Sequence, residues 1–210
     1  MSVIRFENNG IRFDLQIIAS WIRPGSKVLD LGCGEGNLLK YLKEHKGIRG
    51  VGVERDERKV STCVAKGLSV VHGDINSEIQ GYPDNSFDYI IVSQTLQQVY
   101  EPATVLKEAL RIGARAIVSF PNFSHWRVRM QLLFGGYAPV TKELPYQWHD
   151  TPNIRVITLK DFRRFAKEVG FRILKEAPVA TTHDHRKGKI IQTMPTLRAA
   201  YGIFLIGKGK

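Results

Sequence analysis

The stretch VLDLGCGEG, residues 28–36, restricts the fold of this chain more than any other part of its sequence. Strand-favouring apolar residues surround one acid, Asp30, and glycines follow at alternate positions. The segment 37–44 then has the apolar spacing of a helix. A strand, a glycine turn and a helix in this order predict a bend that a ligand approaches closely, because glycine has no Cβ to obstruct it.

Strand and helix patterns alternate through the first 120 residues. Near-continuous apolar strands are expected at 27–31, 50–54, 69–74, 87–94 and 116–120, and amphipathic helices at 14–22, 37–44, 57–67 and 102–113, with Asp14 as the N-cap of the first. Such alternation is typical of a parallel sheet covered on both faces. The fold class predicted is therefore α/β, with a doubly wound, mostly parallel sheet.

The alternation stops after Pro121, where aromatics and prolines are interspersed over residues 121–157. We interpret this segment as an irregular cap inserted after the fifth strand. The later elements expected are a helix at 159–170, a strand at 171–177, a basic loop at 182–189 and a last strand at 201–208, antiparallel to the sixth. The prediction is thus a seven-stranded sheet in a single domain spanning 1–210, the default for this length.

Charge and composition narrow the class of protein. Of the net charge of +11, residues 151–210 contribute 13 Lys and Arg against 4 Asp and Glu. This excess can meet an acidic protein or nucleic acid, but without a nucleic-acid motif a solvated basic face is expected, and no nucleic-acid partner. The apolar runs are too short to span a membrane and the N-terminus lacks a signal-peptide core, so the protein is expected to be cytoplasmic.

Neither thiols nor histidines predict a metal site. Cys33 and Cys63 have no metal-ligand spacing and are expected to be free thiols. His183 and His185 lie close together in the basic loop, but with one acid between them they offer too few ligands for zinc.

Two features indicate an adenosine-containing ligand. The glycines have the spacing G-x-G-x-G, with Asn37 where a dinucleotide-binding turn has its third glycine. Glu54 ends the second strand, 18 positions after Gly36, where a carboxylate can accept hydrogen bonds from both ribose hydroxyls. The glycine turn and this acid are more specific together than either is alone.

The position of Asp30 favours S-adenosylmethionine over a dinucleotide. A carboxylate beside the glycine turn repels a pyrophosphate but attracts an ammonium group. Asp74, after the third strand, can accept the adenine amine, and the backbone of Ile75 can meet the ring. Two plainer roles stay open: Asp74 as a turn cap, and Asp30 as an acid that holds the glycine loop by backbone hydrogen bonds.

These stretches resemble the class I S-adenosylmethionine-dependent methyltransferases, which implies a Rossmann-like methyltransferase fold. VLDLGCGEG, VGVERD and HGDI match the first three motifs, and FDYIIVSQTLQQV matches the strand that leads to the active-site face, where Gln94 follows the strand. The cofactor-binding residues that the resemblance and the residues together suggest are Asp30, Gly32, Cys33, Gly34, Glu54, Arg55, Asp74, Ile75 and Ser93.

A closer resemblance is to the methionine biosynthesis protein family MetW. It rests on the opening DLQIIASWI, on SQTLQQV and on the run 117–162, with PNFSHWR and LPYQWHDTPNI its most specific parts. The resemblance implies a partner that supports homoserine O-acetyltransferase. That the adenosyl site of such a partner senses the pathway's downstream product is our own hypothesis. The alternative is an autonomous S-adenosylmethionine-dependent small-molecule methyltransferase, so the sequence leaves open whether the chain is catalytic or an accessory subunit. SQTL at 93–96 lacks the signature of enzymes that methylate planar nitrogens.

Residues around the cap are the candidates for contact with a substrate or a partner: Gln97, His125, Trp126, Arg127, Tyr146, Trp148 and His149. Trp, Tyr and Arg are enriched in interface hot spots, so these side chains fit a docking surface, a homodimer included, as well as a carboxylated substrate. Alternatively, Trp126 and Trp148 only pack the cap onto the sheet, and His125 and His149 are hydrogen-bonded structural residues rather than a general base.

Overall fold

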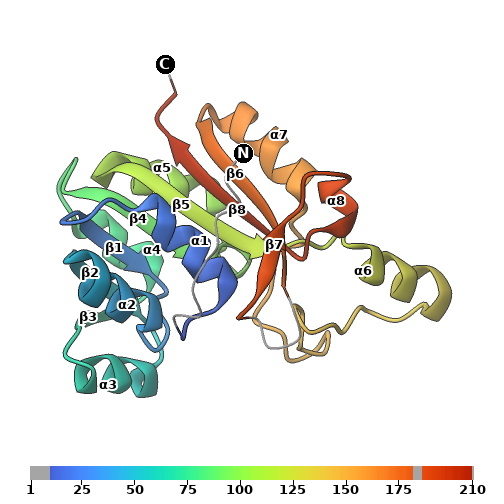
Figure 1. Ribbon diagram of the computed structural model, residues 1–210, viewed down its shortest axis with the longest axis horizontal. Coiled ribbons are helices and arrows are strands. Elements are labelled where there is room, and N and C mark those ends of the chain that lie inside the picture. The colour runs from blue at the N-terminus through green and yellow to red at the C-terminus, as the bar shows by residue number, and fades with distance from the viewer. Residues whose placement is uncertain (1–9, 182–185, 210) are drawn as a thin grey trace.

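The computed structural model describes residues 10–181 and 186–209. Its centre is one eight-stranded sheet with the strand order β3-β2-β1-β4-β5-β8-β6-β7 (Figure 1). The strands are β1 (Lys27–Leu31), β2 (Arg49–Glu54), β3 (Ser69–His72), β4 (Phe87–Ser93), β5 (Gly113–Pro121), β6 (Arg172–Thr181), β7 (Gly188–Ile190) and β8 (Tyr201–Gly207). Strands β1 to β5 pair in parallel, and β6, β7 and β8 pair antiparallel. The predicted doubly wound, mostly parallel sheet is confirmed.

The sheet has one strand more than the seven expected. Residues 188–190, expected within a basic loop, form β7 and pair with β6 through Thr181, Ala180 and Val179. Strand β6 continues to Thr181, past the predicted end at 177, and so offers a free edge for that pairing. Strand β8 lies antiparallel between β5 and β6, beside the sixth strand as predicted.

Helices cover both faces of the sheet (Figure 1). They are α1 (Phe13–Trp21), α2 (Asn37–Lys46), α3 (Glu57–Ala65), α4 (Ile75–Glu78), α5 (Pro102–Ile112), α6 (Trp126–Met130), α7 (Leu159–Val169) and α8 (Pro195–Arg198), with short turns η1 (Ile79–Gly81), η2 (Leu96–Gln98) and η3 (Gln131–Gly135). Buried residues of α5 and α7 form one apolar cluster against the sheet, and those of α1 and α2 form another. Within the described residues, no helix has the length and apolarity needed to cross a membrane.

The first helix begins differently from the prediction. Arg12 stands at the N-cap position, and Asp14 lies inside the helix, buried, where it accepts hydrogen bonds from the Arg12 guanidinium. The prediction that Asp14 caps this helix is therefore wrong. An arginine fork satisfies both carboxylate oxygens at once, whereas a cap would use one.

Strand alternation explains how β1 brings an acid to the sheet. Leu29 and Leu31 belong to the cluster under α5, whereas Val28 belongs to the cluster under α1 and α2. Since successive side chains point to opposite faces, Asp30 shares the face of Val28. Its neighbours in register are Gly52 on β2 and Ile91 on β4, so it is enclosed by strands on both sides.

Candidate functional site

A cavity of about 190 Å³ lies at the carboxyl end of β1, where open parallel sheets bind ligands. Five of the predicted cofactor residues line it: Asp30, Gly32, Cys33, Gly34 and Ser93. Other lining residues are Arg12, Leu15, Glu35, Asn37, Leu38 and Gln94. A larger cavity, of about 440 Å³, is lined by the first residues of β1 to β4 and so lies at the opposite edge of the sheet. The smaller cavity is the one placed for chemistry.

Asp30 is the electrostatic centre of this cavity. Its side chain is 3% exposed, and its Oδ1 atom has no hydrogen-bond partner among the described residues. Burial, and secondly the charge of Glu54, raise the pKa of Asp30 to about 7. A buried carboxylate without a partner is costly unless a cation meets it. Asp30 therefore fits a ligand that carries an ammonium group.

Glu54, rather than Asp30, holds the glycine loop. Its Oε2 accepts a hydrogen bond from the Gly34 amide at 2.8 Å, and its Oε1 accepts from the amides of Arg55 and Asp56, each at 2.9 Å. The loop-holding role that the sequence left open for Asp30 thus belongs to the neighbouring acid. Oε1 accepts two hydrogen bonds, whereas Oε2 accepts one and retains a second lone pair, at which a ribose hydroxyl can still bind.

The three glycines of the loop have the same left-handed backbone conformation, but their surroundings differ. Gly32, Gly34 and Gly36 all have positive φ, at 80°, 57° and 72°. A Cβ on Gly34 would meet nothing within 4 Å, whereas one on Gly32 would lie 2.6 Å from Thr95 Oγ1. A Cβ on Gly36 would lie 2.9 Å from Cys63 Sγ. Only Gly34 therefore leaves open space beside the cavity, while the other two are required by packing.

The two thiols are free, as expected. Cys33 lines the cavity, and burial raises its pKa, so the protonated thiol is favoured. Cys63 is buried on α3, and its Sγ donates to the Gly34 carbonyl at 3.2 Å. Both thiols therefore support the glycine loop in an uncharged form.

The turn after β4 forms the wall opposite the glycine loop. The hydroxyls of Ser93 and Ser119 share a hydrogen bond of 3.0 Å, and the Gln94 amide donates to the Ser119 carbonyl at 2.9 Å. Gln94 has a φ of 55°, a strained value for a residue with a Cβ, and its buried Nε2 has no partner among the described residues. An acceptor on Asp30 and a donor on Gln94 in one cavity match the ammonium and carboxylate of an amino acid.

Asp74 caps a helix. Its Oδ1 accepts from the Asn76 amide at 2.8 Å and from Asn76 Nδ2 at 2.7 Å, at the N-terminus of α4. This is the turn cap that the sequence left open, and contact with adenine stays a prediction. Ile75 packs partly buried against the sheet, and the Arg55 side chain is exposed. These residues follow β2 and β3 and, like Glu54, lie outside the set that lines the cavity.

One residue of the cavity wall was missed by the sequence analysis. Arg12 lines the cavity and holds Asp14 through Nε–Oδ1 at 3.0 Å and Nη2–Oδ2 at 2.5 Å. Burial alone lowers the pKa of Arg12, but the hydrogen bond and charge of Asp14, together with the electrostatic interaction with Tyr201, outweigh it and the net shift is upward. The RFD sequence at 12–14, a cation and an acid at the start of the first helix, is the pattern that points to this pair.

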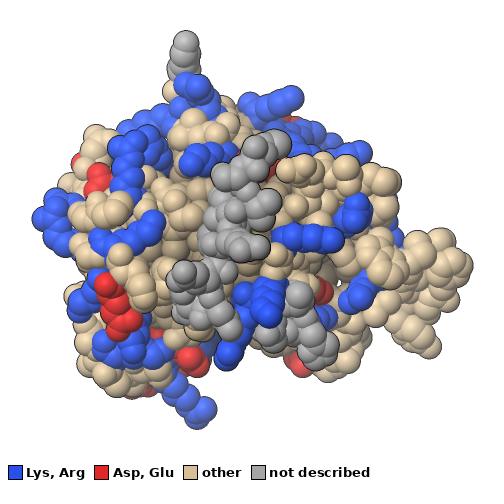
Figure 2. Space-filling view, viewed as in Figure 1, with Lys and Arg blue, Asp and Glu red and all other residues tan. Residues whose placement is uncertain are grey.

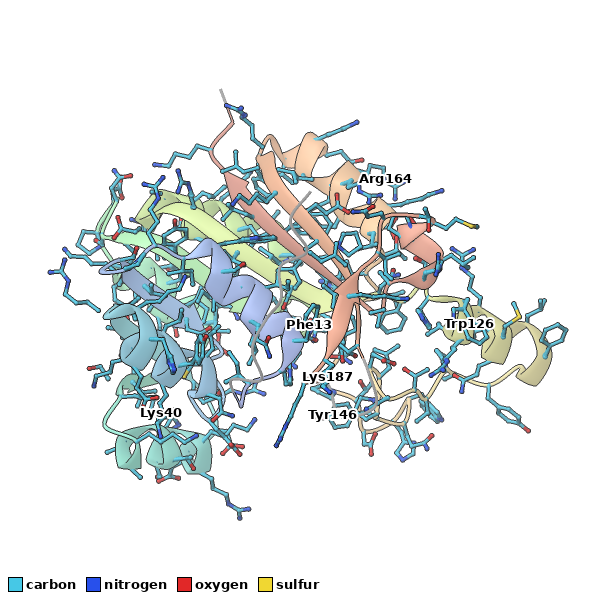
Figure 3. The ribbon with its side chains drawn as sticks, viewed as in Figure 1. Phe13, Lys40, Trp126, Tyr146, Arg164 and Lys187 are labelled. Atoms are coloured by element: carbon cyan, nitrogen blue, oxygen red, sulfur yellow. The ribbon has the colours of Figure 1, made fainter. Side chains whose placement is uncertain are left out.

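The cap candidates divide between structural and exposed residues, of which Trp126 and Tyr146 are labelled in Figure 3. His125 caps α6, where its Nδ1 accepts from the Arg127 amide at 3.3 Å, and burial lowers its pKa. Trp126 is 45% exposed and Trp148 76% exposed, so the alternative that both only pack the cap onto the sheet is wrong. The Arg127 guanidinium lies 5.5 Å from the Trp126 ring, His149 contacts Trp148, and Tyr146 is exposed.

Gln97 connects the cavity to the cap. Its Nε2 donates to the Gln94 carbonyl at 2.7 Å, and its own carbonyl accepts from the amides of Ile154 and Arg155 at 2.9 and 3.0 Å. Arg155 also donates to the carbonyls of Val99 and Tyr100. The cap is therefore hydrogen-bonded to the same turn that forms the cavity wall.

The described residues contain no cluster of three or more His, Cys, Asp or Glu able to hold a metal ion. His183 and His185 lie outside the described residues.

Comparisons with solved structures show what the fold is similar to. A S-adenosylmethionine-dependent methyltransferase from Archaeoglobus fulgidus superposes with a TM-score of 0.72 at 16% identity, covering 96% of this chain and 95% of the other. A methyltransferase from Thermotoga maritima, described as a possible histamine N-methyltransferase, gives 0.67 at 21% identity, with 94% and 87% covered. At these identities the likeness shows the fold alone.

Sequence comparisons are more specific. The "Bifunctional methionine biosynthesis protein MetXA/MetW" of Rhodopirellula baltica is 35% identical over 162 residues, which are 73% of this chain but only 26% of that longer protein. The family model for "Methionine biosynthesis protein MetW" matches residues 12–206, from the arginine beside the cavity to the last strand of the sheet. The chain therefore belongs to the MetW family of methionine biosynthesis proteins and has the fold of the class I S-adenosylmethionine-dependent methyltransferases.

Proposed function

We propose that this protein binds S-adenosylmethionine or S-adenosylhomocysteine in the cavity at the end of β1. The observation that carries the proposal is the buried Oδ1 of Asp30, which has no partner in the described part of the chain and lines the same cavity as Gly34. A phosphate-bearing dinucleotide is disfavoured there, because a second acid, Glu54, reinforces the negative potential.

Each residue has a definable part in holding such a ligand. Asp30 accepts from its ammonium group, the backbone at Gly34 lies against it, and Glu54 accepts from the ribose. Asp74 and Ile75 are the proposed adenine contacts, with Oδ2 of Asp74 facing the amine while Oδ1 caps α4. S-adenosylmethionine, when bound, brings a sulfonium that supplies a methyl group without needing a strong base.

For the whole protein, we place this site in a partner of homoserine O-acetyltransferase. Support comes from the bifunctional relative, whose name joins a MetXA part to a MetW part in one polypeptide. The Gln97 bridge gives a route between ligand and partner, because it joins the cavity turn to the cap. Binding of the adenosyl ligand then reports the level of a methionine-derived product to the acetyltransferase.

A small-molecule methyltransferase is the second candidate, and it is favoured by the methyltransferases among the structural neighbours. Of the two cap histidines that are candidate bases, His125 is poorly placed to abstract a proton, because its Nδ1 already accepts a hydrogen bond from the Arg127 amide. Methyl transfer to a reactive nucleophile needs positioning more than a base, so both candidates share the same adenosyl site.

Two measurements separate the candidates. The first is the thermal melting of the purified chain with each adenosyl compound, where bound ligand raises the midpoint by mass action. The second is co-elution with purified homoserine O-acetyltransferase, together with its turnover in the presence and absence of this chain. A complex and an altered turnover support the partner role. An acetyltransferase that elutes and reacts unchanged contradicts it and leaves the methyltransferase role.

A further inference from the structure

A second surface, distinct from the cavity, is exposed on the cap. The apolar tip, defined as residues 130–140, contains no charged side chain and projects from the body of the molecule (Figures 1 and 2). Phe134 and Tyr137 are each 81% exposed and Leu133 is 69% exposed. Monomeric proteins rarely expose a contiguous apolar patch, and such patches mark interaction sites.

The apolar tip is held in a fixed position at its base. Asn122 Nδ2 donates to the carbonyls of Thr196 and Ala199 at 2.9 and 2.8 Å, before α6 begins. Val128 of α6 is buried, and Gln131 Nε2 donates to the Val140 carbonyl at 3.1 Å, which ties the two ends of the tip together. A surface ordered before binding loses less entropy on association than a loose one.

Charge indicates the nature of the occupant. Arg127 and Arg129 lie on α6 beside the tip, and the chain as a whole carries +11. Two copies meeting through the tip would bring these charges together, which costs free energy. A different protein, whose apolar cleft is rimmed by carboxylates, is complementary to both parts of this surface.

We propose that the apolar tip is the element that inserts into such a cleft on the acetyltransferase partner. This inference rests on the proposed function, and it adds the contact surface and its chemistry. Leu133, Phe134 and Tyr137 are the anchors that fill the cleft, and Arg127 and Arg129 pair with its acidic rim. Tyr and Arg are among the side chains that dominate binding free energy at interfaces, and large apolar side chains such as Leu and Phe contribute by the area that they remove from water.

The test compares full-length variants in titrations with purified homoserine O-acetyltransferase. The double substitution Leu133→Ser with Phe134→Ser is expected to weaken the complex by at least about tenfold, since each removes a hot-spot side chain. Val64→Ser is the matched control, because Val64 is 61% exposed on α3, far from the cap in the chain. Melting temperature and S-adenosylhomocysteine affinity are measured on every variant and are expected to be unchanged.

The possible outcomes distinguish failure of the docking role of the apolar tip from failure of the proposed partnership with the acetyltransferase. If the double variant binds the acetyltransferase as tightly as the wild type does, the docking role of the apolar tip is overturned and the proposed function stays intact. Wild-type protein that forms no complex overturns both. A wild-type homodimer that the double variant abolishes, or tip-dependent sedimentation with phosphatidylglycerol vesicles alone, assigns the tip to another occupant and contradicts the inference. The inference is supported if only the double variant loses affinity for the acetyltransferase and if added salt weakens the wild-type complex.

Discussion

At the scale of single residues, the account depends on Asp30. A carboxylate on an interior strand with a pKa of about 7 destabilises the folded state when it ionises, and we propose that a ligand cation compensates for that cost. Residues that cost stability in this way are typical of binding sites. The loss of stability on ionisation of Asp30 and the binding of a ligand cation can be measured separately.

The first prediction concerns stability and pH. Folded Asp30 keeps its proton up to about pH 7, whereas the unfolded chain loses it near 3.8, so the folded state binds more protons between these values. The contribution of Asp30 to the free energy of unfolding therefore falls as pH rises from about 4 to 7 and is flat above, by up to about 4 kcal/mol in all. Asp30→Asn is expected to remove this fall and to be more stable than wild type at pH 8, as measured by denaturant unfolding.

An exposed acid provides the control for that measurement. Asp150→Asn, on the cap surface, is expected to follow the wild-type pH profile. Equal wild-type and Asp30→Asn profiles would show that Asp30 is ionised at little cost, and its proposed role would lose its physical basis.

The second prediction concerns affinity and pH. Because ligand cation and proton compete for Asp30, the affinity for S-adenosylhomocysteine is expected to fall about tenfold per pH unit below the pKa of about 7. Titration calorimetry in buffers of different ionisation enthalpy is expected to show proton release on binding near pH 6.5. Binding with no proton release and no pH dependence would place the ammonium elsewhere.

At the scale of elements, the glycine loop shows which parts of the site a sequence can predict. Its position after β1 and its positive φ angles follow from local pattern, since strand, glycine and helix preferences are local. The different surroundings of Gly34 and Gly36 do not, because they depend on Cys63 from α3. The sequence also leaves open whether Asp74 caps a turn or contacts adenine, because an acid that follows a strand has the same local pattern in both roles.

The third prediction tests that element. Gly34→Val is expected to reduce adenosyl-ligand affinity by at least about a hundredfold, because its side chain enters the open space beside the cavity. It also costs stability, since a β-branched residue is strained at a φ of 57°. Gly25→Val, with a φ of 72° and equally open space in the turn before β1, reproduces the strain away from the cavity. Similar affinities for the two variants would show that the loop does not contact the ligand.

At the scale of the whole molecule, the alternation of strands and helices was sufficient to predict a doubly wound, mostly parallel sheet, because each strand and each helix has its own local apolar pattern. The extra strand β7 was not predictable, since its three residues pair only when β6 extends far enough to receive them. The Arg12–Asp14 pair was likewise missed, because cap and ion-pair patterns overlap at a helix start. Exposure of Trp148 was undecidable from sequence, since aromatic side chains suit a core and an interface equally.

The fourth prediction concerns coupling between the two surfaces. If the Gln97 bridge transmits ligand occupancy to the cap, the adenosyl ligand changes acetyltransferase affinity, and the acetyltransferase changes ligand affinity by the same factor, typically 5- to 150-fold. Gln97→Ala removes the bond to the Gln94 carbonyl and is expected to reduce that factor toward one while both partners still bind. An acetyltransferase affinity that is the same with and without the adenosyl ligand, or full coupling in Gln97→Ala, would contradict this route.

The most direct test of the central claim is calorimetric titration of the purified chain with S-adenosylhomocysteine at pH 8, beside Asp30→Asn. We expect one binding site in the wild type and at least about a hundredfold weaker binding in the variant, since the ammonium loses its charged partner. Absence of binding in the wild type, or equal affinity in a folded Asp30→Asn, would contradict the claim that this acid holds an adenosyl amino acid.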